Sequence, residues 1–360
     1  MERMKSIEAL SAVFTAGIVA GTLLFTTPSF ALPSLLLPLL TLPCLFKGKL
    51  LSLPEKTAVG IVLGSFLLLG LFCAATSALS YADEPFWMET AAHGAAEKLR
   101  ALIDGLPWES GGTAPLLKAL LTGDRSGLPA HTVAVFRSSG ASHLLALSGL
   151  HIGIIYLLFD KLTWLMGRTK TALYLRFGLI VSGAGFYTLM TGASPSIVRA
   201  FLFILIGETL RLAGRPRKPS RVLCLALFIQ LVLDPAAIRS LGFQLSYLAM
   251  AGIFILYPRM QKWYPEGPQW NPLRRIWQAA ALSISCQVFT GPLVWLRFHT
   301  FPRHFLLTNL LAIPLTTALV ATALVTLLLA GAGWSVPLLL KATDTLANLL
   351  QGVLEIISSM

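Results

Sequence analysis

Two histidines and a serine interrupt one otherwise apolar stretch, Ser142-His143-Leu144-Leu145-Ala146-Leu147-Ser148-Gly149-Leu150-His151-Ile152-Gly153. On a helix, which turns by about 100° per residue, His143, Ser148 and His151 fall within one arc of about 140°. Polar and ionisable groups are costly inside a bilayer, so they usually face the interior of a helix bundle or a wet cavity. We therefore interpret this stretch as the start of a helix that lines a pathway.

Gly149 and Gly153 lie on the opposite side of that helix. Their spacing is a small-xxx-small pattern, which lets a neighbouring helix approach closely. The pattern predicts that one face packs against protein while the other face stays polar.

The composition places the whole chain in a membrane. Of its 360 residues, 55% are hydrophobic and only 12% are charged, and the mean hydropathy is +0.74. A soluble domain of this length needs a more polar surface, and the short alternating segments of a β-barrel are absent. The net charge of +12 would suggest nucleic acid in a soluble protein, but here the positive-inside rule accounts for most of it.

The cysteines indicate neither a disulfide framework nor a metal site, because all four lie in apolar runs without CxxC spacing. They are Cys44, Cys73, Cys224 and Cys286. We expect no cofactor and no bound metal.

The apolar segments predict an all-α polytopic membrane protein with about eleven transmembrane or re-entrant helices. The second segment is short and carries three prolines, so we expect it to be broken or re-entrant. The predicted segments are 9–27, 31–46, 57–79, 143–160, 172–191, 196–213, 222–234, 240–257, 276–297, 305–330 and 334–357.

One long polar interval separates the early spans from the rest. Within it, residues 84–106 have apolar positions at helical spacing and mixed charge, which predicts an amphipathic helix lying on the membrane. We therefore divide the chain into N-terminal membrane helices (1–80), an extramembrane or interfacial amphipathic segment (81–141) and a transmembrane channel domain (142–360).

Lysine and arginine placement predicts the topology. Basic clusters recur in alternate connections, which are expected to be cytoplasmic. With the N-terminus in the cytoplasm, the polar interval before residue 142 lies outside. The clusters are Lys47, Lys49 and Lys56; Lys161, Arg168 and Lys170; Arg211, Arg215, Arg217, Lys218 and Arg221; and Arg259, Lys262, Arg274 and Arg275.

A glycine-rich segment, Gly123-Asp124-Arg125-Ser126-Gly127, lies just outside the predicted membrane region. Asp and Gly favour a turn there, and Asp124 beside Arg125 would neutralise itself. The turn is the interpretation we favour. The alternative is a structured mouth loop in which Arg125 contacts phosphate.

The face of His143, Ser148 and His151 allows three interpretations: buried hydrogen-bonded packing, pore lining and catalysis. A metal site would need a third ligand, and no nearby carboxylate has matching helical spacing. Ser148 also lacks the flanking pattern of a nucleophile elbow.

Three later motifs place further polar groups in spans. Pro195 suits the first turn of a helix, and Arg199 one turn later either reaches back to the outer surface or lines a cavity. Gln244 and Tyr247 share a helix face, where simple interhelical hydrogen bonding is the plainest explanation. Asn309 lies early in a span, which Pro314 is expected to kink.

In combination, these motifs resemble the core signature of the ComEC-type competence proteins, the inner-membrane DNA-uptake channels of naturally transformable bacteria. The resemblance covers roughly residues 95–330. It is carried by the segments 123–128, 136–140 and 142–153, by Ser-Pro-Ser-Ile-Val-Arg-Ala at 194–200, by Asp234-Pro235 with 242–246, and by Asn-Leu-Leu-Ala-Ile-Pro at 309–314, all in the family's order.

The resemblance implies passage of one DNA strand into the cytoplasm, with the protein multi-pass in the bacterial inner membrane. Fuller members carry an OB-like domain, for which the interval 80–142 is too short. They also often end in a metallo-β-lactamase-like domain, whereas this chain stops at Met360 without an HxHxDH cluster. We therefore expect a short form with no nuclease activity and no other enzymatic role.

A strand crossing a bilayer needs a wet, cationic path with sequence-tolerant contacts, and cations together with stacking aromatics supply these. The candidate cations are Arg125 and Arg137 at the outer mouth, Arg199, His143 and His151 deeper, and Arg297 near another outer end. Tyr156, Tyr187, Phe243 and Tyr247 are the candidate stacking groups, and Asp124, Ser148, Gln244 and Asn309 complete the set of pore or DNA-contacting candidates.

The expected partners are single-stranded DNA and the lipid bilayer, with a separate DNA receptor and a nuclease. No P-loop is visible, so pulling force would come from a helicase-like motor or from capture of the strand in the cytoplasm. Three alternatives stay open: a secondary transporter of a small or anionic solute, an intramembrane enzyme that uses His143, Ser148 and His151, and a membrane scaffold with no conduit.

Overall fold

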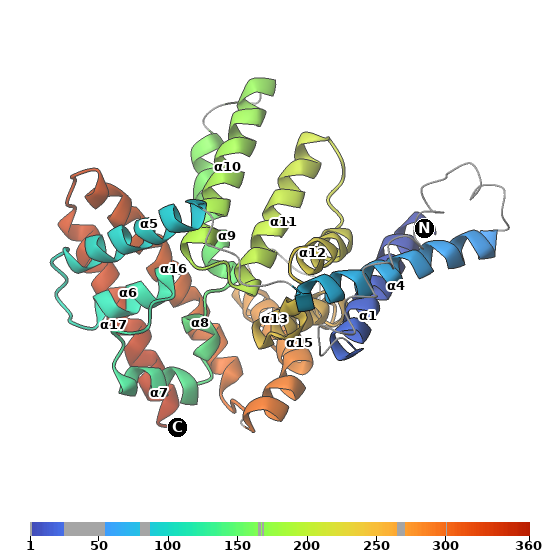
Figure 1. The fold of residues 1–360 in the computed structure, drawn as a ribbon. Coiled ribbons are helices and arrows are strands. Elements are labelled where there is room, and N and C mark those ends of the chain that lie inside the picture. Colours follow the sequence, from blue (N-terminus) through green and yellow to red (C-terminus); the bar gives the residue numbers. More distant parts are fainter. Residues whose placement is uncertain are drawn as a thin grey trace. The chain divides into compact units, whose positions relative to one another are not determined.

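The protein folds as α-helices throughout the described part of the chain, with no β-strand there (Figure 1). The computed structural model describes residues 2–24, 55–79, 87–164, 167, 169–264, 271–299 and 301–360. The helices are α1 (Glu2–Leu24), α4 (Glu55–Leu79), α5 (Trp87–Asp104), α6 (Thr113–Thr122), α7 (Ala130–Ser138), α8 (Ser142–Leu145), α9 (Gly149–Trp164), α10 (Lys170–Met190), α11 (Pro195–Leu212), α12 (Pro219–Leu233), the 3₁₀ helix η2 (Pro235–Arg239), α13 (Leu241–Ile255), α14 (Tyr257–Gln261), α15 (Pro272–Phe298), α16 (Phe305–Gly331) and α17 (Pro337–Ser358).

Four helical segments are long and apolar enough to cross a membrane: Thr171–Met190, Leu241–Gln261, Pro272–Phe298 and Phe305–Gly331. Three shorter apolar helices cover Glu8–Leu23, Val62–Ala75 and Pro219–Leu233. These findings confirm the predicted all-α membrane fold. The number of eleven spans stays a prediction, and the segment 31–46 lies outside the described residues.

The chain divides into two compact units. One unit comprises Met1–Pro85 and Leu202–Gln244, and the other comprises Phe86–Phe201 and Leu245–Met360. The predicted domain boundaries near residues 80 and 141 follow the change from apolar to polar sequence and not the grouping of contacts, and they stay a prediction.

In the first unit, α1 packs closely on α4 because glycines face the opposite backbone. Gly17 lies against the carbonyl of Leu67, and Gly70 lies against the carbonyl of Phe14, with no room for a Cβ at either glycine. Such glycine contacts let membrane helices approach closely. The ring of Phe14 also packs on Phe228 of α12, with ring centroids 4.6 Å apart.

The same unit contains a buried carboxylate, Glu208, which is 2% exposed. Its Oε1 accepts a hydrogen bond of 2.8 Å from Nη2 of Arg217, and Arg211 lies 3.4 Å away. A buried charge is costly unless it is paired and hydrogen-bonded, so this contact fixes the connection between α11 and α12.

The second unit has one apolar core in which α5, α6 and α7 pack with α16 and α17. Its fully buried side chains include Ile103 of α5, Leu120 of α6, Phe136 of α7, Leu319 of α16 and Leu350 of α17. The prediction that residues 84–106 form a helix lying on the membrane is therefore wrong in one respect. The amphipathic helix exists, but its apolar face is covered by protein.

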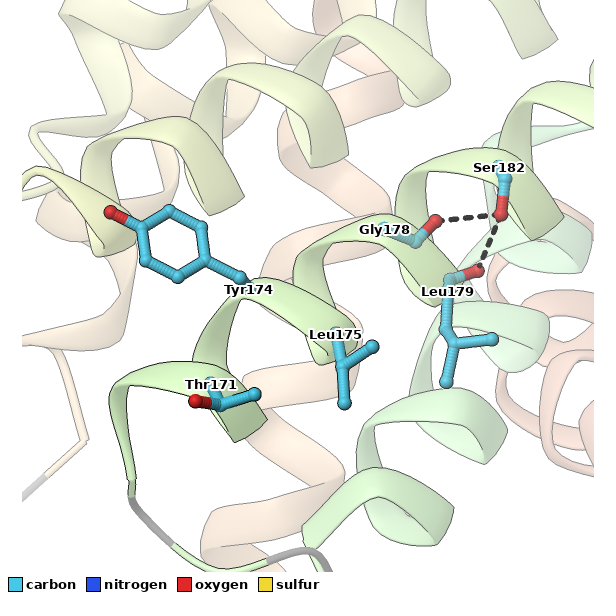
Figure 2. Close-up of a pocket in the computed structure, with 6 residues that line it drawn as sticks. All are labelled: Thr171, Tyr174, Leu175, Gly178, Leu179 and Ser182. Carbon is cyan, nitrogen blue, oxygen red and sulfur yellow. Dashed lines mark hydrogen bonds between the residues drawn. The ribbon is translucent and has the colours of Figure 1, made fainter.

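Helix α10 presents an apolar stripe to its surroundings. Tyr174, Leu175 and Leu179 are 67%, 52% and 45% exposed. These residues line a hollow of about 490 Å³, whose lining comes from α10 alone. Figure 2 shows the lining residues along this helix. The hydroxyl of Ser182 donates to the carbonyl of Gly178 at 2.6 Å, so its polarity is satisfied within the helix. A stripe of this composition suits lipid chains better than a polar ligand.

Candidate polar site at the start of α9

The stretch that the sequence predicts to be one helix is two helices with a break between them. Helix α8 ends at Leu145, Ala146 adopts extended backbone (φ −77°, ψ 131°), and α9 begins at Gly149. The single polar arc predicted for His143, Ser148 and His151 is therefore wrong, because His143 lies on a different helix. Ser148 and His151 still come together.

The break has a local cause in the chemistry of Ser148. Its Oγ accepts a hydrogen bond of 3.3 Å from the N–H of Leu150, as an N-cap serine does. In return, the N–H of Ser148 donates to Nδ1 of His151 at 3.2 Å. This reciprocal pattern is a capping box in which histidine replaces the usual glutamate. A serine that caps a new helix does not continue the old one.

The capping bond also decides how His151 carries its proton. Because Nδ1 accepts from Ser148, the neutral ring carries its hydrogen on Nε2. The side chain is 1% exposed, and the buried Nε2 has no hydrogen-bond partner within the part of the chain that the structure describes. Natural structures leave few buried donors unpaired, so an orphaned one calls for an explanation.

Arg199 of α11 reaches the same helix start. Its Nη2 lies 3.8 Å from the position that a Cβ on Gly149 would occupy, and the Cβ of Ala200 lies 3.3 Å from that position. Gly149 therefore lies close to α11 at this point, and its predicted packing role stays a prediction. Gly153 has no atom within 4 Å of its Cβ position among the described residues, and its predicted packing role also stays a prediction.

The guanidinium of Arg199 is held by α13. Nη1 donates to the backbone carbonyl of Ser246, and Cζ lies 5.7 Å from the centre of the Tyr247 ring. Cation–π attraction of this kind is strongest where water is excluded. Arg199 therefore joins α9, α11 and α13 within the second unit, which neither of its two predicted roles described.

The segment Gly123–Gly127 forms the predicted turn. Oδ1 of Asp124 accepts from the N–H of Ser126 at 3.0 Å and from its hydroxyl at 2.6 Å. These bonds, with the Arg100 guanidinium 3.5 Å away, lower the pKa of the Asp124 carboxyl. Asp124 and Arg125 do not neutralise each other as predicted, because Arg125 donates instead to the carbonyl of Leu145 at 2.8 Å.

Several other predicted residues lie apart from this site. Gln244 donates to the carbonyl of Ile238 at 2.9 Å, so its partner is local and not on another span. Arg137, Arg297 and His143 are exposed, and Nδ1 of His143 lies 3.1 Å from the carbonyl of Gly140.

Helix α16 and two of the aromatic residues predicted to stack on bases carry the remaining candidates. The structure leaves the buried Oδ1 of Asn309 without a partner among the described residues. Pro314 does lie inside helix α16. Tyr187 is buried and donates from its phenol to the carbonyl of Leu121 at 3.1 Å, and its stacking on bases stays a prediction. Phe243 is also buried, at 4% exposed.

The sequence interpretation missed the residues that hold the motif segments together. Thr308 of α16 donates to the carbonyl of Ser139 at 2.6 Å. Gly140 (φ +82°) lies against Pro302, whose Cβ is 2.7 Å from the position that a glycine Cβ would take. Gly123 (φ +78°) lies against Leu147 in the same way. The Ser-x-x-His spacing at 148–151 was the one local signal that could have revealed the helix break.

These elements define a helical membrane protein with a buried histidine and an arginine beside one helix start. The sequence profile of the Competence protein family matches residues 120–360, so this chain belongs to that family. The match includes the Gly123–Gly127 turn, the α8–α9 break and Arg199. The predicted resemblance to competence proteins is thus confirmed.

Curated relatives support the assignment. The chain is 29% identical over 229 residues to the uncharacterized protein YcaI of Escherichia coli K12, which covers 61% of this chain and 29% of that protein. It is 26% identical over 214 residues to ComE operon protein 3 of Bacillus subtilis 168, covering 59% of this chain and 25% of the relative. It is 30% identical over 205 residues to competence protein ComA of Neisseria gonorrhoeae, covering 55% and 28%.

The alignments therefore span between a quarter and a third of each relative's length. No solved structure matches the chain.

Proposed function

We propose that this chain takes part in DNA uptake for natural transformation, as an inner-membrane channel that passes single-stranded DNA into the cytoplasm. The N-terminus is cytoplasmic in this proposal, as the basic connections predict. The proposal concerns this chain alone, because the chain aligns with only part of the length of each relative.

The observation that carries the proposal is the buried Nε2–H of His151, in the first turn of α9, which has no partner among the described residues. A buried donor without an acceptor costs free energy, about 1–3 kcal/mol. A phosphodiester oxygen is an acceptor that would remove this cost during passage. Because the donor is neutral and fixed by Ser148, it can contact each phosphate in turn without holding any one of them tightly.

Arg199 supplies the positive charge for the same path. Its guanidinium has five N–H donors, and the contact with Ser246 uses Nη1. Nη2 lies on the side of Gly149, the first residue of α9. Arginine keeps its charge where lysine would lose it, and it matches phosphate geometry. Tyr247 beneath the guanidinium offers a ring for sequence-tolerant stacking.

The test uses a deletion strain complemented with variants and supplied with labelled duplex DNA. Arg199→Ala should abolish entry of labelled strand while membrane levels stay normal. Arg215→Ala removes an exposed arginine from the α11–α12 connection and serves as the matched control. Normal uptake by Arg199→Ala would exclude this arginine from the path.

His151 can be tested by donor replacement. His151→Gln keeps an N–H donor near the position of Nε2, so it should retain part of the uptake. His151→Phe keeps an aromatic ring but no donor, so it should lose uptake. Equal uptake by the two variants would show that the buried donor has no part in passage.

One observation favours a second function, an intramembrane hydrolase. Oγ of Ser148 lies 3.2 Å from Nδ1 of His151, which is the reach of a nucleophile and its base. The described residues provide no third group that orients the ring, because Nε2 has no partner.

Ser148→Asn separates the two functions, because asparagine is a good N-cap but not a nucleophile. Uptake by this variant should remain close to wild type if the chain is a channel. Our proposal assigns no catalysis to the chain, and loss of uptake in Ser148→Asn with normal membrane levels would favour the hydrolase.

Because the sequence contains no P-loop, the proposal also needs a separate motor, alongside a DNA receptor and a nuclease.

A further inference from the structure

The turn between α15 and α16 exposes aromatic rings and arginines together. Trp295, Phe298 and Phe301 are 55%, 48% and 51% exposed. Arg297 and Arg303 are exposed on the same turn. In Figure 1 this turn is drawn in orange at the lower edge of the view, at the same edge as α7.

The rings on this turn are held in place by their neighbours. Cε2 of Phe301 lies 3.5 Å from the position of a Cβ on Gly291, and its ring meets Phe305 edge-on at 6.2 Å. Trp295 meets the ring of His299 edge-on at 6.3 Å. Exposed rings that are already positioned lose little conformational entropy when a ligand stacks on them.

The turn is fixed to the family motif at two points. Pro302 fits against Gly140, and Thr308 donates to the carbonyl of Ser139. Both contacts involve the segment that directly follows α7, whose last turn carries the exposed Arg137. Arg137 thus lies two residues before one contact point and three before the other.

This surface has no acidic residues in its own chain segments. The sequence contains no Asp or Glu from Arg125 to Phe159 and none from Gly267 to Thr343. No carboxylate of the described chain forms an ion pair with Arg137, Arg297 or Arg303. Their charges are therefore available to an anionic ligand.

We propose that Trp295, Phe301, Arg297, Arg303 and Arg137 form an entry platform, on which bases of the incoming single strand stack while the arginines contact its phosphates. Stacking on fixed rings tolerates any base. This inference rests on the proposed function, and it assigns the strand's first contact before the path at α9.

The competing occupant is the bilayer itself. Aromatic belts at the membrane interface are built mainly from Trp and Tyr, which have a polar end for the headgroups. Two of the three exposed rings here are phenylalanines, which lack that end. The phenylalanines lie beside arginines that have no ion pair among the described residues, on a turn that contacts the family motif. This combination fits single-stranded nucleic acid better than it fits lipid.

The experiment measures binding of fluorescein-labelled oligothymidine, and of a duplex of equal length, to the full chain in nonionic detergent. The double variant Trp295→Ala/Phe301→Ala should weaken single-strand binding about tenfold or more and leave duplex binding unchanged. Arg297→Ala/Arg303→Ala should weaken both and lower the salt dependence by about two charges. Trp334→Ala is the matched control, since Trp334 is 69% exposed on the α16–α17 turn.

Two results of the binding experiment would overturn the platform. One is unchanged oligothymidine binding by both double variants. The other is loss of binding to anionic lipid vesicles in the aromatic variant without any change in oligothymidine binding, which would identify an interfacial belt. Uptake assays separate this inference from the proposed function: if Arg199→Ala blocks uptake while both platform variants take up DNA normally, the channel stands and the platform fails.

Discussion

Arg125 and Leu145 are joined by a hydrogen bond of 2.8 Å from Nη2 of the arginine to the backbone carbonyl. Leu145 is the last residue of α8, and carbonyls at a helix end lack partners within the helix. The loop after α6 therefore satisfies the backbone where α8 and α9 separate. The Gly123–Gly127 turn thus supports the position of Ser148 and His151.

Arg125→Ala should lower the stability of the chain by about 1 kcal/mol, because the Leu145 carbonyl loses a charged donor at a partly exposed site. The measurement is the thermal unfolding midpoint of the detergent-solubilised protein, followed by tryptophan fluorescence. Arg215→Ala, at an exposed arginine, should leave the midpoint unchanged. Equal midpoints for the two variants would show that the bond does not stabilise the fold.

Gly123→Ala should destabilise the chain for two reasons. The residue has φ +78°, which costs a side chain about 1–2 kcal/mol. The new Cβ would also lie 2.6 Å from Cδ1 of Leu147. Gly192→Ala isolates the first effect, because Gly192 has φ +74° and open space around it. Gly123→Ala should unfold at the lower temperature, and adding Leu147→Ala should reduce the contribution of the clash.

Tyr187→Phe should cost about 1 kcal/mol of stability. The variant keeps the buried ring and removes only the phenol that donates to the carbonyl of Leu121, in the last turn of α6. Tyr174→Phe on the same helix is the control, since Tyr174 is 67% exposed. A midpoint for Tyr187→Phe equal to that of the control would mean that water satisfies the Leu121 carbonyl equally well.

Asp124 should make stability depend on acid pH. The hydroxyl and N–H of Ser126, followed by Arg100, hold the pKa of its carboxyl below the ordinary value of about 3.9. A lowered folded-state pKa contributes stability above the unfolded pKa, and this contribution is lost as the pH falls through the folded pKa. Asp124→Asn should therefore show a flatter midpoint–pH curve than wild type below about pH 5. A curve parallel to that of wild type would contradict this assignment, and Ser126→Ala should lie between the two.

The sequence predicted those features that depend on local chemistry. Pro195 begins α11 as its fixed φ requires, and Asp124 forms the turn that its side chain favours. The amphipathic pattern of α5 was also sufficient to predict a helix there. The pattern could not show what covers the apolar face of α5. A helix that lies on a membrane and a helix that packs on α16 and α17 need the same spacing of apolar residues.

The site was only partly predictable. The sequence identifies His151, Ser148 and Arg199 as candidates, but helical periodicity alone predicts one continuous helix through Ser148 and not the break that joins the first two. The competing N-cap bond to Leu150 ended that periodicity. The contacts of Arg199 with Ser246 and Tyr247 could not be read from spacing, because 47 residues separate Arg199 from Ser246.

By itself, the sequence determined that this protein is a bundle of apolar helices with a few costly polar groups, because apolar length and turn chemistry act over short distances along the chain. Only the tertiary structure decided which polar groups meet. Ala200, next to Arg199, lies close to the start of α9 because Gly149 has no side chain, and Pro302 meets the motif because Gly140 has none either. Such contacts depend on how helices distant in sequence approach one another, and the pattern within one helix does not say which distant helix lies against it.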